Sequence, residues 1–244
     1  MRALLAALTC PKGDLDGNLA RHVAFVERAA AEGCDVAVFP EMSLTGYHVP
    51  AAIALDHPAV AALAAATGST GVAAIFGVVE QGAGDAVHIT QVLAEGGEVR
   101  ASYRKRHLGE GEEMFTPGTV PAASWSIAGH PVGVAVCAES LVDFPFDEAA
   151  AAGADVVFFC AAPGLHGRRT DEAGWEDGFR WWCSAGLADA VRHARRLGLW
   201  VALAGQSGAT VDEDFPGLAA LVAPDGEVVA QLPDWREGVL IVDL

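Results

Sequence analysis

The chain has 244 residues, of which 52% are hydrophobic, and a formal net charge of −17. This length suits a single α/β domain, expected to span residues 1–244, and the negative charge argues against a nucleic-acid partner, because phosphates would be repelled. No apolar run reaches the roughly 18 residues of a membrane span, so no membrane partner is expected either.

The N-terminal part predicts strands that alternate with helices. Residues 1–9 are expected to form a buried strand rather than a signal peptide, because the apolar stretch is short and no convincing cleavage site follows. Near-helical spacing of Leu19, Val23 and Val26 predicts a helix over 19–32, with Gly33 as its C-cap. A short apolar strand over 35–39 and an Ala-rich helix over 58–67, ended by Gly68, are predicted next.

The remainder is richer in strands. Residues 86–93 and 99–103 flank a Gly-Gly turn, which predicts a hairpin. Two sheets in one domain, with helices outside them, are the economical arrangement of these elements. The other predicted elements are strands over 71–79, 132–136 and 155–160, a helix over 146–152, a Gly- and Trp-bearing loop over 163–183, a helix over 185–197, and strands over 199–204, 218–223, 227–232 and 238–243, with a Pro-Asp-Gly turn at 224–226.

Three of the predicted strands lead to residues that can do chemistry. Glu41 lies in Phe-Pro-Glu-Met-Ser-Leu-Thr-Gly-Tyr (39–47), Lys105 lies in Tyr-Arg-Lys-Arg-His-Leu (103–108), and Cys137 follows the apolar run 132–136. A cysteine at the end of a buried strand is by itself more often a small core residue than a nucleophile. If the sheets bring these three strand ends together, however, they supply a nucleophile, a base and a cation.

The three segments resemble the signature of the nitrilase, or carbon–nitrogen hydrolase, superfamily, in the family order and with spacings of 64 and then 32 residues. The resemblance covers nearly the whole chain. It implies an αββα sandwich of two mixed β-sheets flanked by helices, with the active site at one end of the paired sheets. It also implies a homodimer or a larger homo-oligomer.

The same resemblance implies the roles of the site residues. Cys137 is expected to be the nucleophile, Glu41 the proton shuttle and Lys105 the group that stabilises the oxyanion, with no metal and no organic cofactor. The family places a second glutamate between the lysine and cysteine segments. Glu110, Glu112 and Glu113 are the candidates, and we choose Glu112, expected to position Lys105 and the substrate.

Four further residues are candidates for contacts with substrate. Ala138 offers a backbone N–H beside the nucleophile, and its small side chain can widen the pocket. Glu139 matches the Cys-Trp-Glu of true nitrilases, although Ala138 does not match the tryptophan. Trp181 and Trp182 are hypothesised to form an aromatic pocket wall, although tryptophan pairs more often serve packing.

The leading functional prediction is cofactor-free hydrolysis of a small non-peptide amide, an ω-amide or an N-carbamoyl compound, through a thioester on Cys137. Nitrile hydrolysis, acyl transfer with the same residues, and a non-catalytic scaffold of the same fold are the alternatives. Five cysteines without a Cys-x-x-Cys pair indicate free thiols and a cytoplasmic location. His107 is expected to be structural and His193 to lie on a helix surface.

Overall fold

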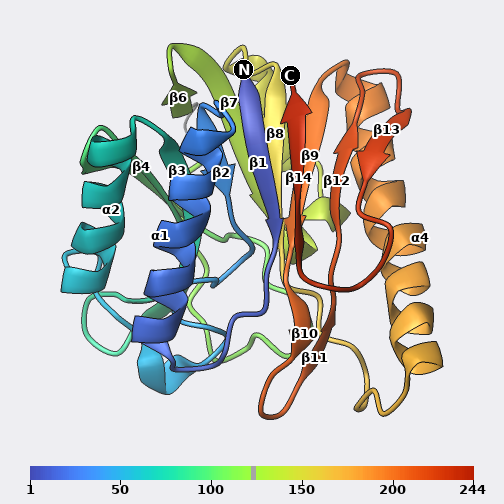
Figure 1. Ribbon diagram of the computed structural model, residues 1–244, viewed down its shortest axis with the longest axis horizontal. Coiled ribbons are helices and arrows are strands. Elements are labelled where there is room, and N and C mark those ends of the chain that lie inside the picture. The colour runs from blue at the N-terminus through green and yellow to red at the C-terminus, as the bar shows by residue number, and fades with distance from the viewer. Residues whose placement is uncertain (122–124) are drawn as a thin grey trace.

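The computed structural model describes residues 1–121 and 125–244. Two β-sheets pack face to face, and helices cover the outer face of each sheet (Figure 1). The αββα sandwich expected from the sequence is therefore confirmed. The helices are α1 (Leu15–Ala31), α2 (Pro58–Thr70), α3 (Phe144–Ala151) and α4 (Glu172–Leu197), and two short 3₁₀ helices are η1 (Val49–Ala51) and η2 (Cys137–Leu141).

Both sheets are mixed. The first has the strand order β14-β1-β2-β3-β4-β5, and the second has the order β13-β12-β9-β8-β7-β6. In each sheet three adjacent strands are parallel, β1-β2-β3 and β7-β8-β9, and the outer pairings are antiparallel. The first sheet comprises β1 (Arg2–Ala7), β2 (Val36–Val38), β3 (Ala73–Gln81), β4 (Val87–Glu95), β5 (Glu98–Arg104) and β14 (Gly238–Asp243). The second comprises β6 (Trp125–Ile127), β7 (His130–Val136), β8 (Val156–Ala161), β9 (Trp200–Gly205), β12 (Ala219–Val222) and β13 (Val228–Gln231), and a separate hairpin pairs β10 (Ser207–Ala209) with β11 (Asp214–Pro216).

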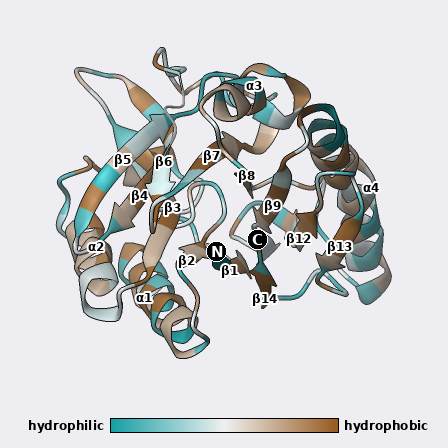
Figure 2. Cartoon of the chain, turned by 90° about the horizontal axis from the view of Figure 1, so that it is seen from above, coloured by the Kyte–Doolittle hydropathy of each residue, from teal (hydrophilic) through white to brown (hydrophobic). Residues whose placement is uncertain are grey.

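Three hydrophobic cores hold the four layers together. One lies between the sheets, a second lies between the first sheet and α1 and α2, and a third lies between the second sheet and α3 and α4. Side chains along β7 alternate between two of these cores, because Val134 and Val136 face the other sheet whereas Ala135 faces the helices. Figure 2 looks along the layers and shows the helices outside both sheets.

Helix α4 differs from the prediction, since it already begins at Glu172, inside the expected loop. Glycine disfavours helices by about 1 kcal/mol relative to alanine, and the glycines of this segment suggested a loop. Packing requires Gly178 of this segment, and also Gly186 further along the helix. A Cβ on Gly178 would lie 2.7 Å from a methyl group of Leu165, and one on Gly186 would lie 2.7 Å from the ring of Trp182. Asp171 caps the helix by accepting a hydrogen bond from the backbone N–H of Gly174 at 2.9 Å.

Helix α2 also extends beyond its predicted end. It continues through Gly68 to Thr70, and Gly71, which has a φ of +73°, is its C-cap. Gly68 allows α2 to lie close to the β4–β5 turn, since a Cβ at this position would lie 2.9 Å from the Cα of Gly97 in that turn. The sequence also did not predict β6, β10 and β11, each of only three residues.

The sheet topology brings three strand ends to one edge of the sandwich. Strand β5 is antiparallel to β4, which is antiparallel to β3, so β5 runs in the direction of β2 and β3. The ends of β2 and β5 lead to Glu41 and Lys105, and the end of β7 in the second sheet leads to Cys137. Across the described ranges, no helix combines the length and the apolar character needed to cross a bilayer.

The Glu41 segment crosses β3 at Gly77. The backbone N–H of Leu44 donates to the carbonyl of Gly77 at 2.9 Å, and a Cβ on Gly77 would lie 2.1 Å from the backbone nitrogen of Met42. The absence of a side chain at Gly77 therefore lets the segment that carries Glu41 lie directly against the sheet.

We predict that Gly77→Ala lowers the free energy of unfolding by about 3 kcal/mol or more, because the added methyl group meets backbone atoms that cannot move aside. Urea denaturation measures this change. Gly174→Ala is the matched control, since a Cβ there meets only side-chain atoms, at 3.2 Å and beyond. A Gly77→Ala protein as stable as the control would contradict the close approach.

Candidate active site

Cys137 directly follows β7 and is the first residue of η2. Its φ of +42° lies in the left-handed region, where a non-glycine residue bears a strain of about 1–3 kcal/mol that is typical of functional sites. The residue lies on the wall of a cavity of about 260 Å³. The cavity is lined by Tyr47, Gly109, Glu110, Gly111, Glu112, Cys137, Ala138, Ala162, Pro163, Gly164, Leu165, His166 and Glu213.

Lys105 lies between two carboxylates. Its Nζ donates to Oε1 of Glu41 at 2.8 Å and to Oε1 of Glu112 at 2.7 Å. All three side chains are buried. Among the three glutamate candidates, Glu112 makes this contact, whereas Glu110 and Glu113 are exposed. The structure therefore brings the four residues expected to be catalytic to one place.

Burial and charge set the protonation states of this group. Burial raises the pKa of Glu41 to about 7, against the lowering effect of Lys105 and with a further increase from Glu112. Burial by itself would lower the pKa of Lys105, but the carboxylates of Glu41 and Glu112 raise it, so the ammonium form persists. Burial and the charge of Glu41 raise the pKa of the Cys137 thiol, and Lys105 opposes this increase.

These directions define what the group can do. The thiol is protonated at neutral pH, so a nucleophilic attack requires a base that removes its proton as the bond forms. Oε2 of Glu41 is buried and has no hydrogen-bond partner among residues 1–121 and 125–244. It is therefore free to accept that proton, while Oε1 remains bonded to Lys105.

A buried polar network fixes the segment that carries Glu41. Nδ1 of His22 contacts the backbone carbonyl of Asn18 at 2.7 Å, and its Nε2 contacts Oγ of Ser43 at 2.9 Å. Burial lowers the pKa of His22 to about 4, so the ring is neutral at pH 7. Because a carbonyl can only accept, Nδ1 carries the proton and Nε2 accepts from the hydroxyl of Ser43.

The sequence predicted that Glu139 contacts the substrate, but the structure places it away from the cavity wall. It is fully buried, and its oxygens accept hydrogen bonds within the chain. Oε1 accepts from the hydroxyl of Tyr103 at 2.6 Å and from the backbone N–H of Arg106 at 2.8 Å, and Oε2 accepts from the backbone N–H of Val136 at 3.0 Å. Glu139 therefore ties the segment of Lys105 to the segment of Cys137 and is a positioning residue.

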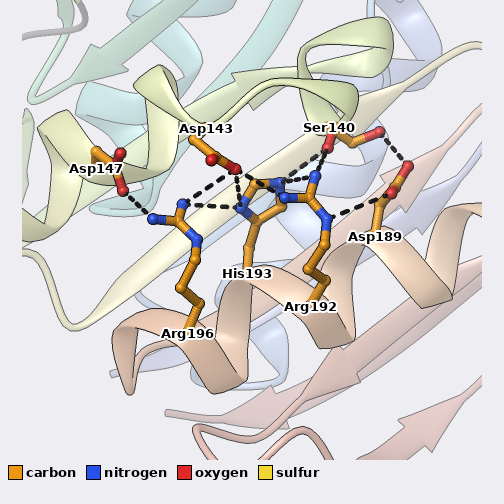
Figure 3. Close-up of polar contacts among 7 residues, drawn as sticks. All are labelled: Ser140, Asp143, Asp147, Asp189, Arg192, His193 and Arg196. Atoms are coloured by element: carbon orange, nitrogen blue, oxygen red, sulfur yellow. Dashed lines mark hydrogen bonds and ion pairs between the residues drawn. The ribbon is translucent and has the colours of Figure 1, made fainter.

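Helix α4 holds the other end of η2 (Figure 3). The backbone carbonyl of Ser140 contacts Nε2 of His193 at 2.8 Å and accepts from Arg192 at 2.7 Å, and the Ser140 hydroxyl donates to Asp189 at 2.9 Å. The ring of His193 stacks on Phe146, with centroids 3.7 Å apart. The prediction of a helix-surface position for His193 was thus wrong, because this side chain is fully buried.

The two tryptophans do not line the cavity of Cys137. Trp182 is buried on α4, and its ring lies 6.3 Å from that of Phe159 between centroids, so it belongs to the core. Trp181 is half exposed and lines a neighbouring cavity of about 310 Å³. Ala138 does line the cavity of Cys137, and His107 lies partly buried beside the Glu139 network.

Several cavity residues were not singled out from the sequence. Tyr47 lies within the Phe-Pro-Glu segment, and its hydroxyl donates to the carbonyl of Gly111 at 3.2 Å. Leu165, His166 and Glu213 come from loops whose sequences carry no recognisable pattern. In the described part of the chain, no group of three or more His, Cys, Asp or Glu side chains is arranged to hold a metal ion.

Comparisons with known proteins show what the chain is similar to. The profile of the carbon-nitrogen hydrolase family matches residues 4–244. Among curated relatives, the glutamine-dependent NAD(+) synthetases of Xylella fastidiosa and Rhodobacter capsulatus are 28% and 31% identical over the whole chain, which covers 44% and 43% of their lengths. The chain thus spans less than half of these relatives.

Among solved structures, an amidase from Nesterenkonia superposes with a TM-score of 0.85 at 26% identity, over 100% of this chain and 90% of that one. A mutant of that amidase is known in complex with butyramide, with the same TM-score and coverage. Another carries the product of a Michael addition of acrylamide at its active-site cysteine.

We predict that Glu139→Gln lowers the free energy of unfolding by about 1–3 kcal/mol, because either orientation of the amide places an N–H group against a backbone N–H donor. We also expect kcat to fall at least about tenfold, since the nucleophile and the cation lose their alignment. Urea denaturation and steady-state kinetics measure the two effects. The exposed Glu110→Gln is the stability control, and an unfolding curve equal to that of the control would contradict the positioning role.

Proposed function

The chain belongs to the carbon-nitrogen hydrolase family, and we propose that it hydrolyses a small non-peptide amide to an acid and ammonia, or an amine, through a thioester on Cys137. The observation that carries this proposal is the buried ammonium of Lys105 held between Glu41 and Glu112, beside a strained cysteine on a cavity wall. A cavity of about 260 Å³ is slightly smaller than drug-sized pockets, which start at about 300 Å³.

The first half of the reaction acylates the enzyme. Glu41 takes the thiol proton as the sulfur of Cys137 attacks the amide carbon, and the carbonyl oxygen becomes an oxyanion. The ammonium of Lys105 stabilises this negative charge, with the backbone N–H of Ala138 as a second donor. Such contacts contribute about 3–4 kcal/mol to catalysis in known sites. The C–N bond then breaks, the nitrogen takes the proton from Glu41, and ammonia or an amine leaves.

The second half releases the acid. A water molecule enters after the amine has left, and Glu41 accepts a proton from it as the oxygen attacks the thioester carbon. The C–S bond breaks, the sulfur regains the proton from Glu41, and the carboxylic acid is free. Each proton accepted by Glu41 is returned, which suits a carboxyl group whose pKa lies near 7.

The choice of an amide over a nitrile or an acyl acceptor rests on sequence and on similarity. Ala138 stands where true nitrilases have tryptophan, and the amidase from Nesterenkonia, which shares the fold, forms a complex with butyramide. Product analysis separates the alternatives, because a nitrilase consumes nitriles and a transferase requires an acceptor amine.

We further propose that the protein works in a reducing compartment such as the cytoplasm, because its five cysteines are free and the mechanism requires a free thiol at Cys137. The expected homodimer stays a prediction that light scattering can test.

We predict that the purified protein releases ammonia from small linear amides and that Cys137→Ala abolishes this release, because the covalent intermediate cannot form. The assay covers amides, N-carbamoyl amino acids and nitriles in parallel. Cys160→Ala is the matched control, since Cys160 is buried in the core between the sheets. Absence of turnover together with a Cys137 that resists alkylation at neutral pH would favour the scaffold alternative.

We predict that kcat/KM rises with pH through about 7 and then levels off, because Glu41 accepts the thiol proton only when ionised and its pKa is raised to about 7. Glu41→Gln should lower kcat/KM by about 100-fold or more and remove this dependence. His166→Asn is the control, because His166 also lines the cavity, and a pH dependence that disappears in this variant would contradict the assignment to Glu41.

A further inference from the structure

Glu213 forms part of the cavity wall and comes from neither of the two main sheets. It lies in the turn between β10 and β11, next to the first residue of β11. Thr210 fixes the backbone of this turn, because its backbone N–H and its hydroxyl donate to the carbonyl of Glu213 at 2.7 and 2.9 Å. The hydroxyl also accepts from the N–H of Glu213 at 3.3 Å. Glu213 is therefore held on a tightly bonded turn.

Lys12 fixes the side chain of Glu213. Its ammonium donates to Oε2 of Glu213 and lies 2.7 Å from a carboxylate oxygen of Asp212. The Lys12 side chain is only 7% exposed, and its ammonium lies 5.2 Å from the centre of the Tyr47 ring. Lys12 is thus engaged by two carboxylates and an aromatic face, and it is not among the residues that line the cavity of Cys137.

The second oxygen of Glu213 faces the cavity wall at Gly164. A Cβ on Gly164 would lie 3.1 Å from Oε1 of Glu213, so the missing side chain keeps this oxygen accessible. Within residues 1–121 and 125–244, Oε1 accepts no hydrogen bond, whereas Oε2 is bonded to Lys12. The cavity therefore has an acceptor that is fixed in direction and free to bind a donor.

The charges around the cavity favour a cationic donor. Glu110, Glu112 and Glu213 line it, and Lys105 is already matched by Glu41 and Glu112. A substrate carboxylate would have to lie near Glu213 and Glu110 without a free cation among the lining residues. A protonated amine in the same place would instead form a charge-assisted hydrogen bond with Oε1 of Glu213.

We propose that Glu213 selects amides whose acyl chain carries a protonated amine at the end remote from the amide, as in short amino-alkanamides. This inference rests on the proposed amide hydrolysis at Cys137 and names its substrate class. Of the classes considered from the sequence, it disfavours those whose remote end carries only a carboxylate, as N-carbamoyl acids do.

Three amides of similar size test the proposal: 4-aminobutanamide, which is cationic, pentanamide, which is neutral, and succinamate, which is anionic. For the unmodified protein we expect kcat/KM for 4-aminobutanamide to exceed that for pentanamide by about tenfold or more, and succinamate to be the poorest substrate. Added salt should reduce the preference, because the contact is electrostatic and partly open to solvent.

Glu213→Gln should lower kcat/KM for 4-aminobutanamide by about tenfold and leave the value for pentanamide within about threefold. The pentanamide rate reports that the variant is folded and active. Gly164→Ala is a second variant, which covers Oε1 without changing any charge, and it should reduce the same preference. Asp212→Asn is the charge-matched control, since Asp212 pairs with Lys12 outside the cavity, and it should retain the preference.

The outcomes separate this inference from the proposed function. If pentanamide or succinamate is the best substrate, or if Glu213→Gln retains the preference for the amine, the role of Glu213 is overturned and amide hydrolysis stands. If the unmodified protein hydrolyses none of the three amides and Cys137 resists alkylation, both are overturned.

Discussion

The ammonium of Lys105, buried between Glu41 and Glu112, is the interaction on which the rest of the site depends. Moving a charge out of water costs several kcal/mol unless it is paired. Burial raises the pKa of Glu41 to about 7, with a further increase from the second carboxylate, Glu112, and against the lowering effect of Lys105. The arrangement that lets these charges be buried also gives Glu41 the proton affinity that a shuttle needs.

The charged group in turn requires a rigid backbone, and buried polar residues outside the cavity supply it. His22 and Ser43 fix the segment of Glu41, and Glu139 joins the segments of Lys105 and Cys137. On the outer side, Ser140 is tied to α4 through His193. Because these contacts join both sheets and a helix, the alignment of the charged group with Cys137 depends on the whole sandwich. The strained φ of Cys137 can persist only in such a framework.

The group of Glu41, Lys105 and Cys137 and the remainder of the cavity wall come from different parts of the chain. The reactive side chains follow the ends of β2, β5 and β7, and other parts of the cavity wall come from the loop 162–166 and from Glu213 before β11. Loops can change without disturbing the strands.

The sequence by itself determined most strands of the sheets and the positions of Glu41, Lys105 and Cys137 at strand ends, because apolar strands followed by reactive residues leave a local pattern. The αββα class followed from the resemblance of these segments to a known family. It could not choose firmly among Glu110, Glu112 and Glu113, and it misplaced Glu139, His193 and the start of α4. These depend on contacts that form only in the folded chain: Glu112 on Lys105, Glu139 on Tyr103, His193 on Ser140, and Gly178 of α4 on Leu165. Only the tertiary structure decided them, because burial and hydrogen-bond partners arise when the two sheets pack together.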